Sequence, residues 1–291
     1  MDIRKRLKEI EEILPGDYGD LSSAKKYLDS IERSGVNKLL NIFKEIEEEI
    51  KNTEFIIYSS FYEMVSKELN FITYSLKDIE DLCPIIKGDE DRIGIYISAA
   101  INKIIKDGDE VRLNFRNRRI DFIGMYLSKG KVIVEGDVGN NVGHGMKGGS
   151  IHIKGNARSY IGYEMENGNI IVKGNAGDFV GSWMKGGSIH IKGNAGVGVG
   201  FGMENGNIIV KGNAGDNVGY VMIGGIINIK GNARNYVGSG MENGSIHIKG
   251  NAGSFVGFYS KGGEIRIDGE YKSIWWECEA KIYHKGKLIK D

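Results

Sequence analysis

Residues 212–230 read GNAGDNVGYVMIGGIINIK, and this unit of 19 residues recurs through the C-terminal half of the chain. The copies share the pattern G-N-A-G-x-x-V-G-x-x-M-x-x-G-x-I-x-I-K. Each copy opens on the pair Gly-Asn, at Gly155, Gly174, Gly193, Gly212, Gly231 and Gly250. A fixed period over this many copies is typical of proteins built by stacking one structural unit.

The residues within each unit favour strands over helices. Four or five glycines in 19 residues are too many for a pair of helices, whereas I-x-I-K alternates apolar and polar residues as a half-buried strand does. The recurring valines and methionines supply two further inward columns, and the glycines form the corners. We therefore predict a single-stranded right-handed β-helix of about eight turns from 117 to 269, stacked at about 4.8 Å per turn.

Two polar columns are expected to stabilise the stack. The asparagines that follow the opening glycines would form a ladder of amides bonded to the turns on either side. Four residues in consecutive turns alternate in sign, so we expect ion pairs along them. These four are Lys147, Glu166, Lys185 and Glu204, and the same column continues with Ile223, Glu242 and Lys261.

The rest of the chain predicts a helical domain and an end cap, so the fold class is α+β multidomain. Apolar spacing and the positions of Pro15, Gly35 and Pro84 predict helices over 2–14, 20–35, 37–51, 53–83 and 91–106. A first strand, VRLNF, follows at 111–115. The predicted domains are a helical domain at 1–108 and a right-handed β-helix at 109–291. The tail from about 270 leaves the repeat and is expected to plug the open end.

Composition limits the function. Of the 39 basic and 39 acidic residues, 16 and 24 fall in residues 1–110, so an acidic N-terminal part precedes a basic repeat region. Zero net charge argues against a dedicated nucleic-acid binder. The two cysteines lack metal-site spacing. We expect no cofactor and no membrane segment, and we place the protein in the cytoplasm.

The motif GxxGxxxG carries a resemblance to a known family. It occurs as GNAGDFVG (174–181), GNAGDNVG (212–219) and GNAGSFVG (250–257). These repeats resemble the GXGXG β-helix domain of glutamate synthase large subunits and the GXGXG-repeat subunit of formylmethanofuran dehydrogenase. Together with the lead-in ISAAINKIIKDGDEVRLNF (97–115), the resemblance covers about 92–269. Arg158 and Arg234 depart from the motif.

The resemblance implies a rigid spacer and packing platform without catalytic residues. Glutamate synthase activity is not expected, because the glutaminase domain, the flavin-binding barrel and the iron–sulfur cysteines of that enzyme have no counterpart here. Protein partners are expected instead, such as subunits of a redox or amidotransferase complex. The apolar helix predicted over 53–83 also indicates a homo-oligomer.

Outward columns of the repeat are the candidate interaction surfaces. A lysine column either binds an anionic partner or is balanced by solvent and by the acidic helical domain. A neighbouring column alternates histidine and isoleucine, and its isoleucines suggest that the helical domain or a partner covers this face. An aromatic stripe either forms an interface or packs locally. The candidates are Lys154, Lys173, Lys192, Lys211, Lys230, Lys249, His152, His190, His247, Tyr160, Phe179, Tyr236 and Phe255.

Catalysis and metal binding are the weaker hypotheses. His152 and His190 are two turns apart, about 10 Å, which is too far to share one metal ion. Asp178 and Asp216 are also two turns apart, a separation compatible with a carbohydrate-active enzyme. Each follows a glycine in a turn, where aspartate is common. The sequence therefore favours a structural or interaction protein over an anion- or nucleic-acid-binding protein and over an enzyme.

Overall fold

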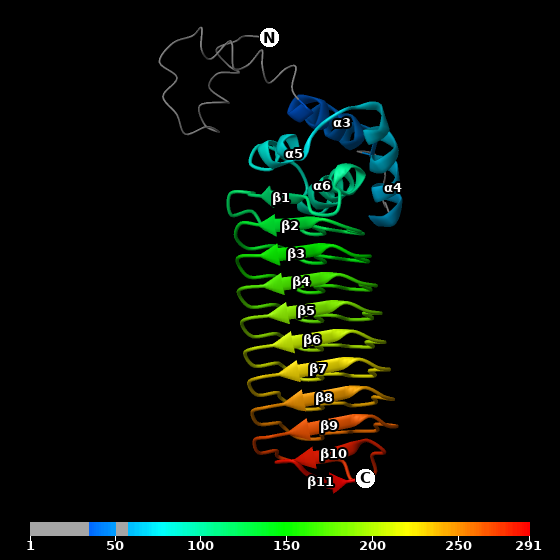
Figure 1. Ribbon diagram of the computed structural model, residues 1–291, viewed down its shortest axis with the longest axis vertical. Coiled ribbons are helices and arrows are strands. Elements are labelled where there is room, and N and C mark those ends of the chain that lie inside the picture. The colour runs from blue at the N-terminus through cyan, green and yellow to red at the C-terminus, as the bar shows by residue number, and fades with distance from the viewer. Residues whose placement is uncertain (1–34, 51–57) are drawn as a thin grey trace.

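The chain folds into a β-solenoid with helices at its N-terminal end (Figure 1). A computed structural model describes residues 35–50 and 58–291. Ten strands pair in parallel in sequence order, and an eleventh pairs antiparallel with the tenth. The strands are β1 (Glu110–Leu113), β2 (Lys131–Val134), β3 (Ser150–Ile153), β4 (Asn169–Val172), β5 (Ser188–Ile191), β6 (Asn207–Val210), β7 (Ile226–Ile229), β8 (Ser245–Ile248), β9 (Glu264–Ile267), β10 (Lys281–His284) and β11 (Lys287–Lys290).

The predicted inward columns form the core. From β3 to β9 the second and fourth residues of each strand are buried and the other two face outward. The valine and methionine columns are fully buried as well, for example at Val218 and Met222. Ten parallel strands make nine turns, one more than predicted. The hydrophobic core is continuous from the helices to β10.

The asparagine column forms a ladder, but its bonds differ from the prediction. Each side-chain Oδ1 accepts the backbone N–H of the residue 19 positions later, as from Asn194 to Asn213 and from Asn213 to Asn232, both at 2.8 Å. At the end of the column the acceptor Asn251 meets the N–H of Glu270. This carbonyl also explains the glycine before each asparagine: a Cβ on Gly212 would lie 2.4 Å from Oδ1 of Asn194. The Gly-Asn pair is therefore one packing unit across two turns.

Replacing Asn213 with alanine should cost about 1 kcal/mol of unfolding free energy, because the N–H of Asn232 loses its acceptor. Asn213→Asp is the matched control, since it keeps that oxygen. Asp137 occupies the same column and accepts the N–H of Asn156 at 2.8 Å. Urea unfolding should rank the alanine variant clearly below the aspartate variant; equal stability of the two would mean that the ladder bond contributes nothing.

The expected ion pairs along the charged stripe form at one place among the described residues, between Glu242 and Lys261. Within the described part of the chain, Lys147, Glu166, Lys185 and Glu204 make no ion pair with one another; further along the same column Lys261 meets Glu242 at 2.9 Å. Exposed charges one turn apart gain little from pairing and lose side-chain entropy by doing so. The prediction was therefore wrong for Lys147, Glu166, Lys185 and Glu204.

The described helices are α3 (Gly35–Ile50), α4 (Tyr58–Glu68), the 3₁₀ helix η1 (Leu69–Phe71), α5 (Leu76–Leu82) and α6 (Glu90–Ile104). The helices predicted over 37–51 and 91–106 correspond to α3 and α6, whereas those over 2–14 and most of 20–35 lie outside the described residues. The single helix predicted over 53–83 is wrong. The helical conformation ends at Phe71, and a separate helix, α5, follows with Ser75 as its N-cap residue and a capping box between Ser75 and Asp78.

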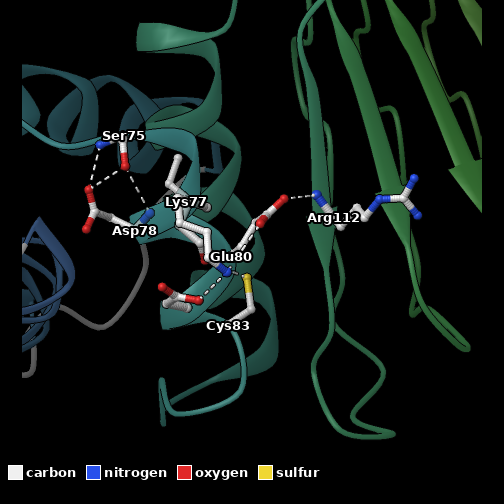
Figure 2. Close-up of polar contacts among 8 residues, drawn as sticks. Ser75, Lys77, Asp78, Glu80, Cys83 and Arg112 are labelled. Carbon is white, nitrogen blue, oxygen red and sulfur yellow. Dashed lines mark hydrogen bonds and ion pairs between the residues drawn. The ribbon is translucent and has the colours of Figure 1, made fainter.

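Helix α6 closes the N-terminal end of the solenoid. Its nine consecutive residues 93–101 are all buried, because helices pack on one side and the first turns of the solenoid on the other. Ser98 Oγ accepts the N–H of Gly124 at 2.9 Å. The adjacent α5 covers the open edge of β1: Glu80 accepts the backbone N–H of Arg112 at 2.8 Å (Figure 2). This edge is thus protected from pairing with another strand.

A pH dependence is expected from Asp91, which receives a hydrogen bond from Tyr58 at 3.1 Å. Burial, followed by the nearby Asp121 carboxylate, raises the pKa of Asp91. A raised folded-state pKa means that Asp91 binds a proton more tightly in the folded cap than in the unfolded chain. Protonation of Asp91 therefore stabilises the fold at acidic pH, and this stabilisation is lost as pH rises through the folded-state pKa.

Asp91→Asn should therefore raise the thermal midpoint at neutral pH, with the difference from the unsubstituted protein shrinking toward pH 4. Thermal unfolding followed from acidic to neutral pH measures this. A constant difference between Asp91→Asn and the unsubstituted protein at all pH values would contradict the assignment.

The tail adds a ninth turn before it closes the C-terminal end. The repeat motif is absent, yet Ile274 bridges to Val256, and Ile282 is fully buried. Strand β10 then pairs with β9 in parallel register, and β11 folds back on β10. The tail therefore continues the sheet, where the sequence predicted that it leaves the repeat.

Candidate functional site

The outward residues of β3–β9, together with the lysine that follows each strand from β3 to β8, form one surface, here called the lysine face. The strands are in register, so equivalent residues of successive turns lie side by side. The backbone N–H of each column lysine continues this register, as from Lys192 to the carbonyl of Val172 at 2.9 Å. The face therefore carries the predicted columns at about 4.8 Å spacing.

The lysine column is mostly without acidic partners. All six lysines are exposed, and Lys154 pairs with Glu135 at 2.6 Å. The other five have no ion pair among the described residues. The same repeat position is acidic in the turns at either end of the column, at Glu135 and at Asp268, and Asp268 pairs with His247 at 2.9 Å. The unpaired lysines are Lys173, Lys192, Lys211, Lys230 and Lys249.

The described helices do not cover this face. They gather at the N-terminal end, where α4 reaches down beside Phe122 and Tyr126 of the first turn, whereas the strands run down the length of the solenoid (Figure 1). The expectation that the helical domain balances the lysines or covers the isoleucines is therefore wrong for the described helices. Ile171 and Ile209 are half-buried by their neighbours within the face, and Ile226 on β7 is 49% exposed.

The histidines do not converge on a shared ligand. His247 binds Asp268, while His152 and His190 stand in separate turns of the same column. Burial and then Lys131 lower the pKa of His152. Among the described residues, no group of three or more histidine, cysteine or acidic side chains is placed to hold a metal ion.

The aromatic stripe occupies a corner away from the strands. Tyr160 stacks on Phe179, and Tyr236 on Phe255, each pair with ring centroids 5.1 Å apart. All four residues have a positive φ near 60°, a conformation that ordinarily favours glycine or asparagine. Ring stacking contributes about 0.5–1.5 kcal/mol and helps to offset that strain. These rings pack locally, yet Tyr160 and Phe255 remain 38% and 39% exposed.

The two aspartates considered for catalysis have structural partners. Asp178 accepts the N–H of Val197, and Asp216 accepts the N–H of Asn235, both at 2.8 Å. They thus belong to a second ladder that runs through the next corner, with Asn140 and Ser159 in the same column. Their carboxylates are used to connect turns.

Two features of the surface were not predicted from the sequence. The first is the direction of the asparagine amides, which is set by the ladder bonds. The second is a shallow groove of about 540 Å³ beside the N-terminal turns, in which Arg158 has no ion pair among the described residues. Arg158 stands where the repeat motif has glycine, and this departure from the motif was the sequence feature that could have indicated the groove. The groove is lined by Arg119, Val138, Asn140, Asn156, Ala157, Arg158, Ser159, Asn175, Ala176 and Gly177.

Comparisons with known proteins identify no relative: no protein-family model matches the chain, and no curated protein sequence matches it either. The GXGXG resemblance therefore stays a prediction that depends on the repeat motif. None of the described helices is both long and apolar enough to cross a membrane.

Proposed function

We propose that this chain is a non-catalytic scaffold whose lysine face docks a protein partner within a larger cytoplasmic assembly. The observation that carries the proposal is the row of five lysines without ion-pair partners in the described structure, on a face that no described helix covers. Like charges about 4.8 Å apart repel one another, and an acidic partner surface would relieve that repulsion. A stack of nine turns with one continuous core suits a rigid platform.

The repeat motif suggests the kind of assembly. Its resemblance to the GXGXG domain favours an accessory subunit of a redox or amidotransferase complex, in which this chain supplies packing surface. The same proposal accounts for Asp178 and Asp216 as structural residues. The half-exposed aromatic corner offers a second contact area, suited to self-association into a homo-oligomer.

The test is purification from the native host under mild conditions of two forms of the chain, one unsubstituted and one carrying Lys192→Glu with Lys211→Glu. We expect a partner in fixed ratio with the unsubstituted chain and at least about a tenfold loss with the variant, since two docking charges are reversed. Lys147→Glu with Lys185→Glu is the matched control, because these lysines lie outside the column. Elution of the unsubstituted chain alone would overturn the proposal.

A further inference from the structure

We propose that the partner contacts the lysine face with an acidic, amphipathic α-helix lying along the solenoid axis. This inference rests on the proposed docking function and adds the chemistry and shape of the docked element. It is drawn from the spacing of the lysines, the direction of the neighbouring amides and the pattern of the adjacent isoleucines.

The edge of the face offers hydrogen-bond donors almost exclusively. Because Oδ1 of Asn175, Asn194 and Asn213 each accepts a backbone N–H at 2.8 Å, their Nδ2 groups must point the other way. None of these Nδ2 groups has an acceptor within the described structure. Each lies two residues after a column lysine, so rows of NH₂ and NH₃⁺ groups run in parallel. Carboxylates are acceptors only and match such a surface.

The spacing of the column selects a helix over an extended segment. Lysines recur at about 4.8 Å, and one turn of an α-helix rises about 5.4 Å. Over the four steps from Lys173 to Lys249 the mismatch reaches only about 2.4 Å, which flexible lysine stems accommodate. Side chains on one face of an extended strand recur at about 6.8 Å and would be displaced by about 8 Å over the same length.

The neighbouring column explains why the helix should be amphipathic. Ile171 and Ile209 are separated by two turns, about 9.6 Å, with His190 between them. Residues seven apart on an α-helix are separated by about 10.5 Å. An apolar residue once per heptad would therefore meet each isoleucine while carboxylates follow the lysines.

Single-stranded nucleic acid fits this face less well. Such binding relies on aromatic side chains that stack on bases beside the basic groove. No aromatic residue stands in the lysine or His/Ile columns of β3–β9. The ring of Tyr283 continues the His/Ile column on β10, but the Arg266 guanidinium covers it at 4.2 Å from the ring centroid. Tyr160 and Phe179 belong to another corner and stack on each other. Nucleic acid is accordingly an alternative outcome of the test.

The test is fluorescence anisotropy with the full chain and a synthetic helical peptide of about 24 residues. The peptide carries glutamate on each helical turn of one face and leucine once per heptad beside it. A peptide of the same composition in scrambled order, and an oligonucleotide of similar charge, are the comparison probes. We expect the ordered peptide to bind at least about tenfold more tightly than the scrambled one, and binding to weaken with salt.

Variants locate the contact. Lys192→Gln with Lys211→Gln should weaken binding of the ordered peptide by about tenfold, and Ile171→Ser with Ile209→Ser by a similar factor. The matched control, Lys147→Gln with Lys185→Gln, should leave it unchanged. Circular dichroism of each variant verifies that the solenoid is intact.

The outcomes separate the two proposals. Equal binding of the ordered and scrambled peptides, or preference for the oligonucleotide, would overturn the helix inference. If a natural partner still co-purified and was lost with the Lys192 and Lys211 charge reversals, the scaffold function would stand with another kind of docked element. If neither peptide nor partner depended on the column, both proposals would fail.

Discussion

Ile227→Ala should lower the unfolding free energy by about 2–5 kcal/mol, one of the largest effects expected from a single truncation in this chain. Ile227 is fully buried on β7, between Ile208 and Ile246 of the neighbouring turns. Its Cδ1 fills the space above Gly200, where an added Cβ would lie only 2.3 Å away. Truncation therefore leaves a cavity in a column that continues through the whole solenoid.

The neighbouring residue supplies the control. Ile226 is in the same strand and has the same side chain, but it faces outward and is 49% exposed. Ile226→Ala should change the unfolding free energy by less than about 0.5 kcal/mol. Urea unfolding followed by circular dichroism measures both variants. Similar losses for the two would show that β7 does not separate an inner from an outer face.

The success of the sequence prediction in the solenoid has a physical cause. Stacking one residue type on itself at each turn makes the inward columns visible as a period of 19 residues, so valine, methionine and isoleucine identify the core directly. The same periodicity placed the column of Lys173 and Lys192 on the outside. Each position was in effect observed several times, once per copy.

Where the repeat is absent, the prediction failed for equally physical reasons. The break before α5 depends on a local capping box, Ser75 to Asp78, which the apolar spacing over 53–83 does not reveal. In the tail, Ile274 and Ile282 take inward positions without the glycine motif, so the sequence predicted a cap in place of the ninth turn. Local hydrogen bonding determines the break before α5, and local packing determines the ninth turn in the tail.

The candidate site was predicted only in part. Column identity shows which residues are neighbours, but not which donor meets which acceptor. Thus the asparagines were found, whereas their bonds to backbone N–H groups were not. Likewise the sequence showed an excess of lysine, but only the placement of the helices at the N-terminal end reveals that the described helices leave the face uncovered (Figure 1).

Gly94→Ala should detach or displace the N-terminal cap, with a loss of about 3 kcal/mol or more in its local stability. A Cβ on Gly94 would lie 1.6 Å from the carbonyl oxygen of Asp121 and 3.1 Å from Ile120. Neither the backbone carbonyl nor the buried isoleucine can move away without disturbing the first turn. Helix α6 would therefore have to shift off the end of the solenoid.

Hydrogen exchange tests this prediction locally. In Gly94→Ala the amides of α6 and residues 120–124 should exchange much faster, while those of β5–β8 stay protected, since distant turns retain their own contacts. Gly108→Ala is the control, because a Cβ there meets no atom within 4 Å although its φ is +88°. It should cost about 1 kcal/mol of backbone strain and leave α6 protected. Unchanged exchange in Gly94→Ala would mean that α6 does not pack on the first turn as closely as described.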